Sequence, residues 1–343
     1  MIENKLLNYF KSEQPYRFLG KSIKNLFFPV KDEINVTKTI SIEVSSICDV
    51  KCIFCIYHLG YRGKKIMMPE EFKRVARSAV NLGYDNLDLT PPSGELFLNK
   101  NAVEIVKIAK DSGFKHIGAY TNGISLHNHN LDELLRSGIN VIIISFPGFG
   151  KTFYQEICRA DKFEEFTESI ALLLEIHKKI NSQVIIIFEP RTYLSIKQIK
   201  ESDFYCKIVS KFIKDIVFVR EPLRVFDSWC GEIKGKNLVK GMRVDINPIK
   251  SIHPFKNAYP CIRIFTMGVL VNGDVRLCNC RYDKTIGTEK DPLFIGNIYN
   301  YKDLEELIKE NDEKIERMRS GFCNGKMAVL CKKCPFYRPV KFS

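Results

Sequence analysis

The sequence predicts an α/β protein made of a partial (β/α)6 TIM-like barrel and a small C-terminal module held together by metal. Between residues 39 and 222, short apolar runs alternate with amphipathic helical stretches. Strands that alternate with helices form a parallel sheet with the helices outside it. After residue 222 the alternation stops, and cysteines gather between residues 259 and 338. A chain of 343 residues has room for a barrel of roughly 200 residues and an accessory module.

Each element of the barrel follows from its apolar pattern. The expected strands are short buried runs at residues 40–45, 86–89, 116–120, 141–145, 183–188 and 216–220. The expected helices have apolar residues at helical spacing and cover residues 69–81, 102–112, 131–136, 162–179 and 199–212. Six such repeats in series favour an open parallel barrel.

The rest of the chain is less regular. Residues 265–277 read as two strands joined at Asn272-Gly273, a pair that favours the positive φ angles of a tight hairpin, and a charged helix is expected over residues 302–319. We therefore expect four parts: a lead-in (1–38), the barrel (39–222), a linker (223–258) and the hairpin-plus-helix module (259–338).

The twelve cysteines are the most informative part of the composition. The sequence has no run of about 18 apolar residues and no signal peptide, so we expect a cytoplasmic protein without a transmembrane segment. Thiols stay reduced there and serve as metal ligands. The net charge of +13 is spread along the chain without a tight Lys/Arg block, which argues against a nucleic-acid partner. A basic surface also suits an acidic ferredoxin or flavodoxin that delivers electrons.

Three cysteines lie within eight residues directly after the first expected strand: Cys48, Cys52 and Cys55. The carboxyl ends of barrel strands are where α/β barrels place their chemistry. A 4Fe-4S cluster with four cysteine ligands is coordinatively closed, whereas three ligands leave one iron open to a small molecule. The alternative is a structural zinc loop that takes a fourth ligand from elsewhere in the chain.

The C-x3-C-x2-C spacing, with Phe54 before the last cysteine, resembles the signature of the radical S-adenosylmethionine (SAM) superfamily. The resemblance implies that the open iron chelates SAM and that an electron from the cluster cleaves it to methionine and a 5′-deoxyadenosyl radical. This radical would abstract a hydrogen atom from the substrate, while the protein supplies position and electrostatics. It also implies adenine contacts around Phe54, because residues 184–189 lack the glycine-rich pattern seen in some members.

The end of the second expected strand fits the same resemblance. Ser93-Gly94-Glu95 is similar to the family's Gly-Gly-Glu motif, with serine in place of the first glycine. The resemblance implies that this segment binds SAM and that Glu95 binds its amino group. The alternative for Glu95 is an exposed loop carboxylate.

Later strand ends add three expected SAM contacts. Asn122, in Thr-Asn-Gly, resembles the turn that often follows the third strand, although Asn-Gly is also ordinary turn chemistry. In relatives, a serine at the fourth strand end and an arginine in the next helix contact the ribose and carboxylate of SAM. Ser145 and Arg159 match these positions, and an arginine fork suits a carboxylate. The alternatives are a strand cap and a surface charge.

The module contains four cysteines expected to hold a second 4Fe-4S cluster: Cys261, Cys278, Cys331 and Cys334. With the Gly-x4-Cys spacing that ends at Cys278 and an Ile-Gly-Asn-Ile segment at 295–298, they resemble the SPASM/twitch subgroup of radical SAM proteins. No cysteine follows Cys334, which resembles the shorter twitch type with one auxiliary cluster. A four-cysteine zinc site is the alternative.

The roles of the remaining cysteines stay open. Cys278 and Cys280 are two apart on a strand and so face the same side, and Cys323 also precedes the C-x2-C pair, so the sequence leaves open which of these three are ligands. Cys280, Cys323 or Cys230 could instead donate a hydrogen atom to a substrate radical, as in radical epimerases. The alternative is an inert buried thiol.

The expected function is therefore a radical SAM oxidoreductase or epimerase acting on a small or carbohydrate-like molecule. Loss of an electron from the substrate radical to the auxiliary cluster gives dehydrogenation, and return of a hydrogen atom from a thiol gives epimerisation. An alternative within the enzyme class is a SPASM-type peptide maturase. Such maturases often carry a leader-binding domain of about 80 residues, and residues 1–38 are too short for one. An alternative of another class is a zinc-dependent nucleic-acid-binding module. The sequence does not name the substrate, the reductant or the oligomeric state.

Overall fold

The computed structural model describes residues 30–31, 38–147, 150–214, 216–245, 261–279, 281–323, 326–334 and 340–341. Nearly all of the expected lead-in, Cys280 and the side chain of Cys323 lie outside this description. The possible hydrogen-donor roles of these two cysteines stay predictions.

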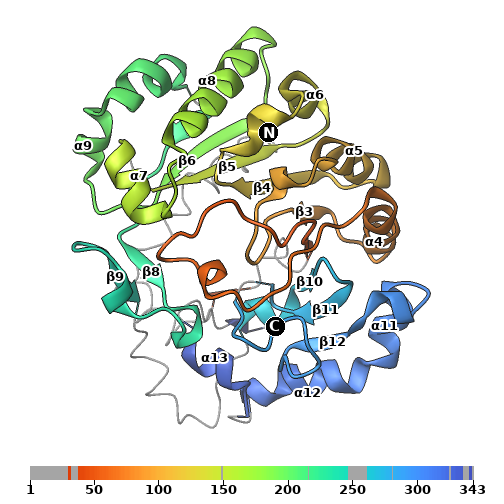
Figure 1. Ribbon diagram of the computed structural model, residues 1–343. Coiled ribbons are helices and arrows are strands. Elements are labelled where there is room, and N and C mark those ends of the chain that lie inside the picture. Colours follow the sequence, from red (N-terminus) through yellow and green to blue (C-terminus); the bar gives the residue numbers. More distant parts are fainter. Residues whose placement is uncertain are drawn as a thin grey trace.

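One sheet of nine strands organises the described part of the chain, in the order β12-β11-β10-β2-β3-β4-β5-β6-β7 (Figure 1). Its six consecutive parallel strands are β2 (Thr39–Ile42), β3 (Asn86–Asp88), β4 (His116–Thr121), β5 (Val141–Phe146), β6 (Ile185–Pro190) and β7 (Val217–Val219). The expected parallel sheet is confirmed, with strand ends shifted by one to three residues, and it is consistent with a partial TIM barrel.

Helices that follow the strands pack around the outside of the sheet (Figure 1). They are α4 (Pro69–Asn81), α5 (Ala102–Ser112), α6 (Leu131–Arg136), α7 (Lys151–Cys158) and α8 (Phe163–Lys179). The first three have the predicted bounds. In α4, Pro69 occupies the first turn, where its missing N–H costs nothing, and Glu71 accepts a hydrogen bond from Met68 N at 2.7 Å. The eight residues of α7 were missed, because so short a helix gives little periodicity.

The helix expected over residues 199–212 is wrong as a single element. The structure has α9 (Ile196–Lys200), a π-helical turn η4 (Tyr205–Val209) and a 3₁₀ turn η5 (Ser210–Phe212). Ser195 and Gln198 form a capping box that starts α9 earlier than predicted. Ser202 then bonds the backbone at both ends of the break, donating to Ile199 O at 2.8 Å and accepting from Tyr205 N at 3.2 Å.

The C-terminal strands extend the barrel sheet. β10 (Met267–Val269) pairs parallel with β2 and antiparallel with β11 (Asp274–Leu277), which pairs antiparallel with β12 (Phe294–Asn297). The expected hairpin is confirmed, although its strands are shorter and its loop covers residues 270–273. Gly273 has φ of +88°, and a Cβ there would lie 2.4 Å from the Tyr299 ring, so the turn requires glycine.

The predicted charged helix is two helices, α11 (Leu304–Glu310) and α12 (Asp312–Cys323), followed by α13 (Val329–Lys333). The break falls at Asn311, whose side-chain amide donates to Tyr301 Oη at 3.1 Å and to Leu307 O at 2.9 Å. The amide thereby competes with the regular helical bonding pattern.

The expected irregular linker contains a parallel strand pair, β8 (Val225–Asp227) and β9 (Arg243–Asp245). Two 3₁₀ turns lie between them, η6 (Trp229–Gly231) and η7 (Gly235–Asn237). A second small sheet joins β1 (Val30–Lys31) to β13 (Val340–Lys341). Strands of two or three residues are too short to show the alternation by which strands are recognised in a sequence, so these pairs were missed.

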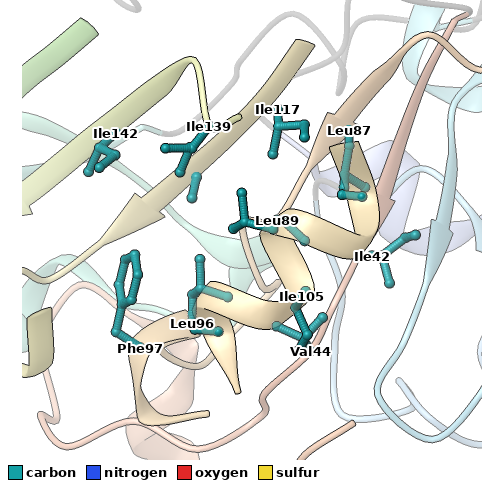
Figure 2. Packing of buried hydrophobic residues seen from close by; sticks show 14 of the residues in the cluster. Ile42, Val44, Leu87, Leu89, Leu96, Phe97, Ile105, Ile117, Ile139 and Ile142 are labelled. Atoms are coloured by element: carbon teal, nitrogen blue, oxygen red, sulfur yellow. The ribbon is translucent and has the colours of Figure 1, made fainter. Parts of the chain in front are cut away.

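Both faces of the parallel sheet carry buried apolar residues, in clusters of different size. One face packs against the helices through a large apolar cluster, part of which Figure 2 shows with Ile42 of β2, Leu87 of β3, Ile117 of β4, Ile142 of β5 and Ile105 of α5. On the opposite face of β5 and β6, Val141, Ile143, Ile185 and Ile187 form a smaller cluster. Within the described ranges, no helix combines the length and apolar character needed to cross a bilayer.

The barrel and the C-terminal module are joined by more than the β2–β10 pairing. On α4, Arg74 donates to Ile298 O at 3.4 Å and to Lys302 O at 3.3 Å. Ser78 of the same helix accepts from Leu304 N, the first residue of α11, at 2.7 Å. These contacts fix the module against the barrel.

Neighbouring leucines of α8 test its packing. Leu173 is fully buried, whereas Leu172 is 40% exposed. Leu173→Ala should lower the free energy of unfolding by about 2–5 kcal/mol because it leaves a cavity, and Leu172→Ala by less than about 1 kcal/mol. Urea unfolding under reducing, anaerobic conditions measures both variants. Equal losses would contradict this placement of α8.

Candidate functional site

The three clustered cysteines lie in the loop that leaves β2. Two backbone hydrogen bonds hold this loop against the end of α7, from Lys51 N to Cys158 O at 3.0 Å and from Ile53 N to Ile157 O at 2.9 Å. Asp49 is fixed from the other side, because it accepts from Asn122 Nδ2 at 2.7 Å and from Ser125 Oγ at 3.3 Å. The loop is therefore held in place independently of any ligand.

The thiols of this loop are desolvated and close to one another. Burial, followed by the nearby Glu95 and Cys52, raises the pKa of the Cys48 thiol. Burial and Cys52 raise the pKa of Cys55 to about 12. Iron binding requires thiolates, so a metal centre here would have to displace these protons. Its positive charge would reverse the electrostatic preference for neutral thiols.

A fourth cysteine, not singled out by the sequence, lies beside this loop. Cys158, at the end of α7, is buried, and its Sγ lies 3.5 Å from Cys52 Sγ. This contact is the first cause of the raised pKa of Cys52, and burial is the second. A lone cysteine in a short helix carries no sequence signal that distinguishes it from a core residue.

Glu95 is the best-defined acidic group of the site. It is 2% exposed, and its carboxylate accepts from Thr121 Oγ1 at 2.6 Å, Asn122 N at 2.7 Å and Phe97 N at 3.2 Å. Burial raises its pKa to about 7 although these hydrogen bonds favour the charged form. The structure thus brings Glu95 and Asn122 together, and Asn122 also contacts Cys48, with Nδ2 3.8 Å from Sγ.

The neighbouring Gly94 has a steric role. Its φ is +150°, and a Cβ would lie 2.4 Å from Ser45 O, so only glycine allows this close approach to the strand. The next residue bonds the same segment, because Glu95 N donates a hydrogen bond to Ile47 O at 2.6 Å. Ser93 is buried, and its hydroxyl hydrogen-bonds Tyr282, a fully buried residue of the C-terminal module. Burial, followed by Cys55, raises the pKa of the Tyr282 phenol, so the module reaches the three-cysteine loop.

Phe54 is packed more tightly than an open adenine platform would be. It is 8% exposed and stacks on Phe226 of β8 with ring centroids 4.8 Å apart. The Arg191 guanidinium lies 5.5 Å from the centroid of the Phe54 ring. The Phe54 carbonyl accepts a hydrogen bond from Trp229 Nε1 at 3.0 Å. The side chain therefore helps to fix the loop, and its role as a SAM contact stays a prediction.

The other two predicted SAM contacts lie near the same edge. Ser145 is on β5 opposite Glu189 of β6, near the carboxyl ends of both strands. Arg159 is exposed and caps α7 in the left-handed region with φ of +54°, next to the backbone that bonds the cysteine loop. A non-glycine residue in this region is uncommon and points to a local constraint.

A charged group that the sequence did not indicate lies at the ends of β6 and β7. Glu189 is 2% exposed and pairs with Arg191 at 3.0 Å and with Arg220 at 2.9 Å. Tyr120 of β4 donates to the same carboxylate at 3.4 Å. Each residue alone looks like an ordinary strand-end polar residue, and only the alignment of the strands in the sheet brings them together.

The cysteines of the C-terminal module come from different elements. Cys261 begins the 3₁₀ turn η8 (Ile262–Phe265), which packs on β11 and α12, and Cys278 follows β11 with φ of +58°. Cys331 and Cys334 lie in and directly after α13, which packs on the η6 turn that contains Cys230.

The three-cysteine loop offers the type of ligand that a 4Fe-4S cluster uses. Among the described residues, no three His, Cys, Asp or Glu side chains converge on a point that one metal ion would occupy. A 4Fe-4S cluster does not need such a point, because each thiolate binds a different iron. Three half-buried thiols on one loop suit that chemistry.

The raised pKa of Glu95 makes stability depend on pH. An unfolded glutamate titrates near 4.5 and Glu95 in the folded chain near 7, so between these values the folded state binds more protons and stability falls as pH rises. From pH 5 to pH 8, the iron-free wild type should lose about 2–3 kcal/mol relative to Glu95→Gln, measured by urea unfolding. Glu104→Gln, on the exposed face of α5, is the matched control. A flat difference between wild type and Glu95→Gln would contradict the buried, ionisable state.

Comparison with known sequences identifies the barrel. Residues 42–201 match the model of the radical SAM superfamily. A protein of Pyrococcus abyssi named probable GTP 3′,8-cyclase is 22% identical over 72% of this chain and 86% of its own length. A protein of Methanothermobacter thermautotrophicus with the same name is 20% identical over 88% and 96%. The GTP 3′,8-cyclase of Desulforamulus reducens is 30% identical, but the match covers 40% of this chain and 43% of that relative.

Solved structures support the fold. SuiB of Streptococcus suis, bound to its precursor peptide SuiA, superimposes with a TM-score of 0.57 at 14% identity, covering 96% of this chain and 81% of SuiB. BtrN in complex with AdoMet and 2-DOIA gives a TM-score of 0.50 at 17% identity, covering 87% and 92%. The family match, together with the three-cysteine loop at the end of β2, favours the enzyme class over a zinc-dependent nucleic-acid-binding module. Residues 42–201, which include the three-cysteine loop, therefore resemble the radical SAM superfamily.

Proposed function

We propose that Cys48, Cys52 and Cys55 hold the 4Fe-4S cluster that binds and cleaves SAM. The observation that carries this proposal is the placement of three desolvated thiols next to the Gly94-Glu95 turn at the carboxyl ends of the parallel strands. When bound, the cluster supplies the electron that breaks a carbon–sulfur bond of SAM and releases the 5′-deoxyadenosyl radical.

The surrounding residues bind and orient SAM in this proposal. Glu95 takes the amino group, because its buried carboxylate is already oriented by Thr121 and Asn122. Arg159 pairs with the SAM carboxylate, and Ser145 contacts the ribose, which suits its position at the end of β5. Ser93 acts indirectly, since its hydroxyl is engaged by Tyr282.

The second cluster is proposed to bind Cys261, Cys278, Cys331 and Cys334. The support is that η8 packs on β11 and that the thiols of Cys278 and Cys331 both lie within electrostatic reach of the buried Arg276. Cys230 lies in η6, which packs on α13. Its predicted role as a hydrogen-atom donor therefore competes with a place beside the auxiliary site. We propose the twitch arrangement, in which this module extends the barrel at β2.

The proposed reaction begins with transfer of a substrate hydrogen atom to the 5′-deoxyadenosyl radical. Loss of one electron to the auxiliary cluster and of one proton then completes a dehydrogenation, whereas return of a hydrogen atom from a thiol gives an epimer. A small polar substrate fits the charged group of Glu189, Arg191 and Arg220 at the strand ends.

A specific second candidate is a purine nucleotide. Two relatives named probable GTP 3′,8-cyclase are aligned over 72% and 88% of this chain, and two arginines at the strand ends suit an anionic substrate. The likeness of fold to SuiB keeps peptides as the rival substrate class. Incubation with deuterated GTP, aminocyclitols or peptides, followed by analysis of label in 5′-deoxyadenosine, distinguishes these classes.

SAM cleavage tests the first proposal directly. Protein reconstituted anaerobically and given dithionite should turn SAM into methionine and 5′-deoxyadenosine, and Cys52→Ala should reduce this to the protein-free background because the cluster loses a ligand. Cys206→Ala removes an exposed cysteine of η4 and should leave the rate unchanged. Cleavage that survives Cys52→Ala would overturn the assignment.

Metal analysis tests the second cluster. The wild type should bind about eight irons, and a Cys48→Ala/Cys52→Ala/Cys55→Ala variant about four, since one complete cluster remains. Cys331→Ala/Cys334→Ala should also bind about four. Zinc in place of iron, or an iron-free triple variant, would contradict an auxiliary iron-sulfur cluster.

A further inference from the structure

A buried arginine lies in the middle of the C-terminal module. Arg276, on β11, is 0% exposed and is the largest fully buried side chain among the described residues. It stands opposite Gly268 of β10, and the pairing with β12 shifts register between Val275 and Arg276. A bulge of this kind re-aims the side chain that follows it. Burying a guanidinium is costly, so its partners must be accounted for.

Asp291 neutralises this arginine. Arg276 Nε donates to Asp291 Oδ2 at 2.7 Å, and Nη2 donates to Oδ1 at 3.2 Å, in a two-pronged arrangement. Asp291 is 5% exposed and accepts also from Leu293 N at 3.0 Å, which fixes its orientation. The pair is shielded from water and salt, so its charges act over distance far more than surface charges do.

The third guanidinium nitrogen of Arg276 donates hydrogen bonds to the backbone. Arg276 Nη1 donates to Cys278 O at 2.6 Å and to Arg281 O at 3.1 Å. Cys278 has φ of +58°, a strained conformation for a non-glycine residue, and these bonds help to hold it there. The segment continues to Tyr282, which meets Ser93 beside the three-cysteine loop. Arg276 thus bonds the backbone at Cys278 and at Arg281, next to Tyr282.

The guanidinium also lies within electrostatic reach of two proposed cluster ligands. After its main partner Asp291, the guanidinium interacts electrostatically with the thiols of Cys278 and Cys331. Arginine keeps its charge at every pH at which the protein is folded. A permanent positive charge therefore stands beside the site.

We propose that Arg276 is a positioning residue that holds the ligand Cys278 and, with Asp291, sets the reduction potential of the auxiliary cluster. The proposal rests on the cysteine assignment of the proposed function, and it adds the charged pair that tunes the reduction potential of the cluster. A positive charge favours the reduced, more negative cluster, and Asp291 moderates this effect. The balance between the charges of Arg276 and Asp291 decides how readily the cluster accepts an electron from a substrate radical.

Variants of the two partners should shift the potential in opposite directions. Arg276→Gln removes the positive charge, so at the wild-type midpoint potential the ratio of reduced to oxidised cluster should fall about tenfold, equivalent to about 59 mV for one electron. Asp291→Asn removes the negative charge and should raise the ratio. Arg276→Lys keeps the charge and should stay within about threefold of wild type, although the fork is lost.

The measurement is a potentiometric titration followed by electron paramagnetic resonance. It uses the full chain with Cys48, Cys52 and Cys55 changed to alanine, so that the signal comes from the auxiliary cluster alone. The control is Arg136→Gln, which breaks an exposed Arg136–Asp132 pair at 3.0 Å on α6 and should leave the potential unchanged. If Arg276→Gln does not fold, Asp291→Asn and Arg276→Lys still carry the test.

The outcomes separate the inference from the proposed function. Opposite shifts for Arg276→Gln and Asp291→Asn, or an upward shift for Asp291→Asn with little change for Arg276→Lys, support tuning by charge. Unchanged potentials, or shifts of the same sign in both partners, overturn the inference while leaving the cluster assignment intact. An iron-free parent variant overturns the auxiliary cluster itself, and the inference with it.

Discussion

The site depends on the attachment of the cysteine loop to the end of α7. Backbone hydrogen bonds from Lys51 and Ile53 to the last residues of that helix hold a loop that would otherwise be free to move after β2. Asp49, bonded by Asn122 and Ser125, holds it from the opposite side. In the proposed site, the attachment keeps Cys48, Cys52 and Cys55 on a loop whose position is set by the barrel.

The barrel elements could be predicted from the sequence because their apolar patterns are local. The bounds of α4, α5 and α6 were predicted correctly, since each has a clear apolar stripe and a definite start or end. The motif around Cys48, Cys52 and Cys55 was equally local. Gly94 and Glu95 followed from resemblance, and the structure adds the reason that Gly94 tolerates no Cβ.

What the sequence could not supply is contact between distant segments. Cys158 lies 106 positions from Cys52, and nothing in a short helix marks it as a neighbour of the loop. Tyr282 reaches Ser93 only because β10 pairs with β2 and brings the module alongside the barrel. Glu189, Arg191 and Arg220 meet through the alignment of β6 and β7, which no single motif encodes. The broken helix after Lys200 has a different cause, namely side-chain competition by Ser202 for backbone bonds.

The β2–β10 pairing has a practical consequence for dissecting the protein. The edge of the six parallel strands at β2 is covered by β10, so the barrel and the module share one hydrogen-bonded sheet. A chain cut before Cys261 would leave the N–H and C=O groups on that edge of β2 unpaired, and exposed strand edges recruit other chains. Such a fragment would self-associate through the uncovered strand, and its insolubility would report a broken sheet and say nothing of the chemistry of the three-cysteine loop.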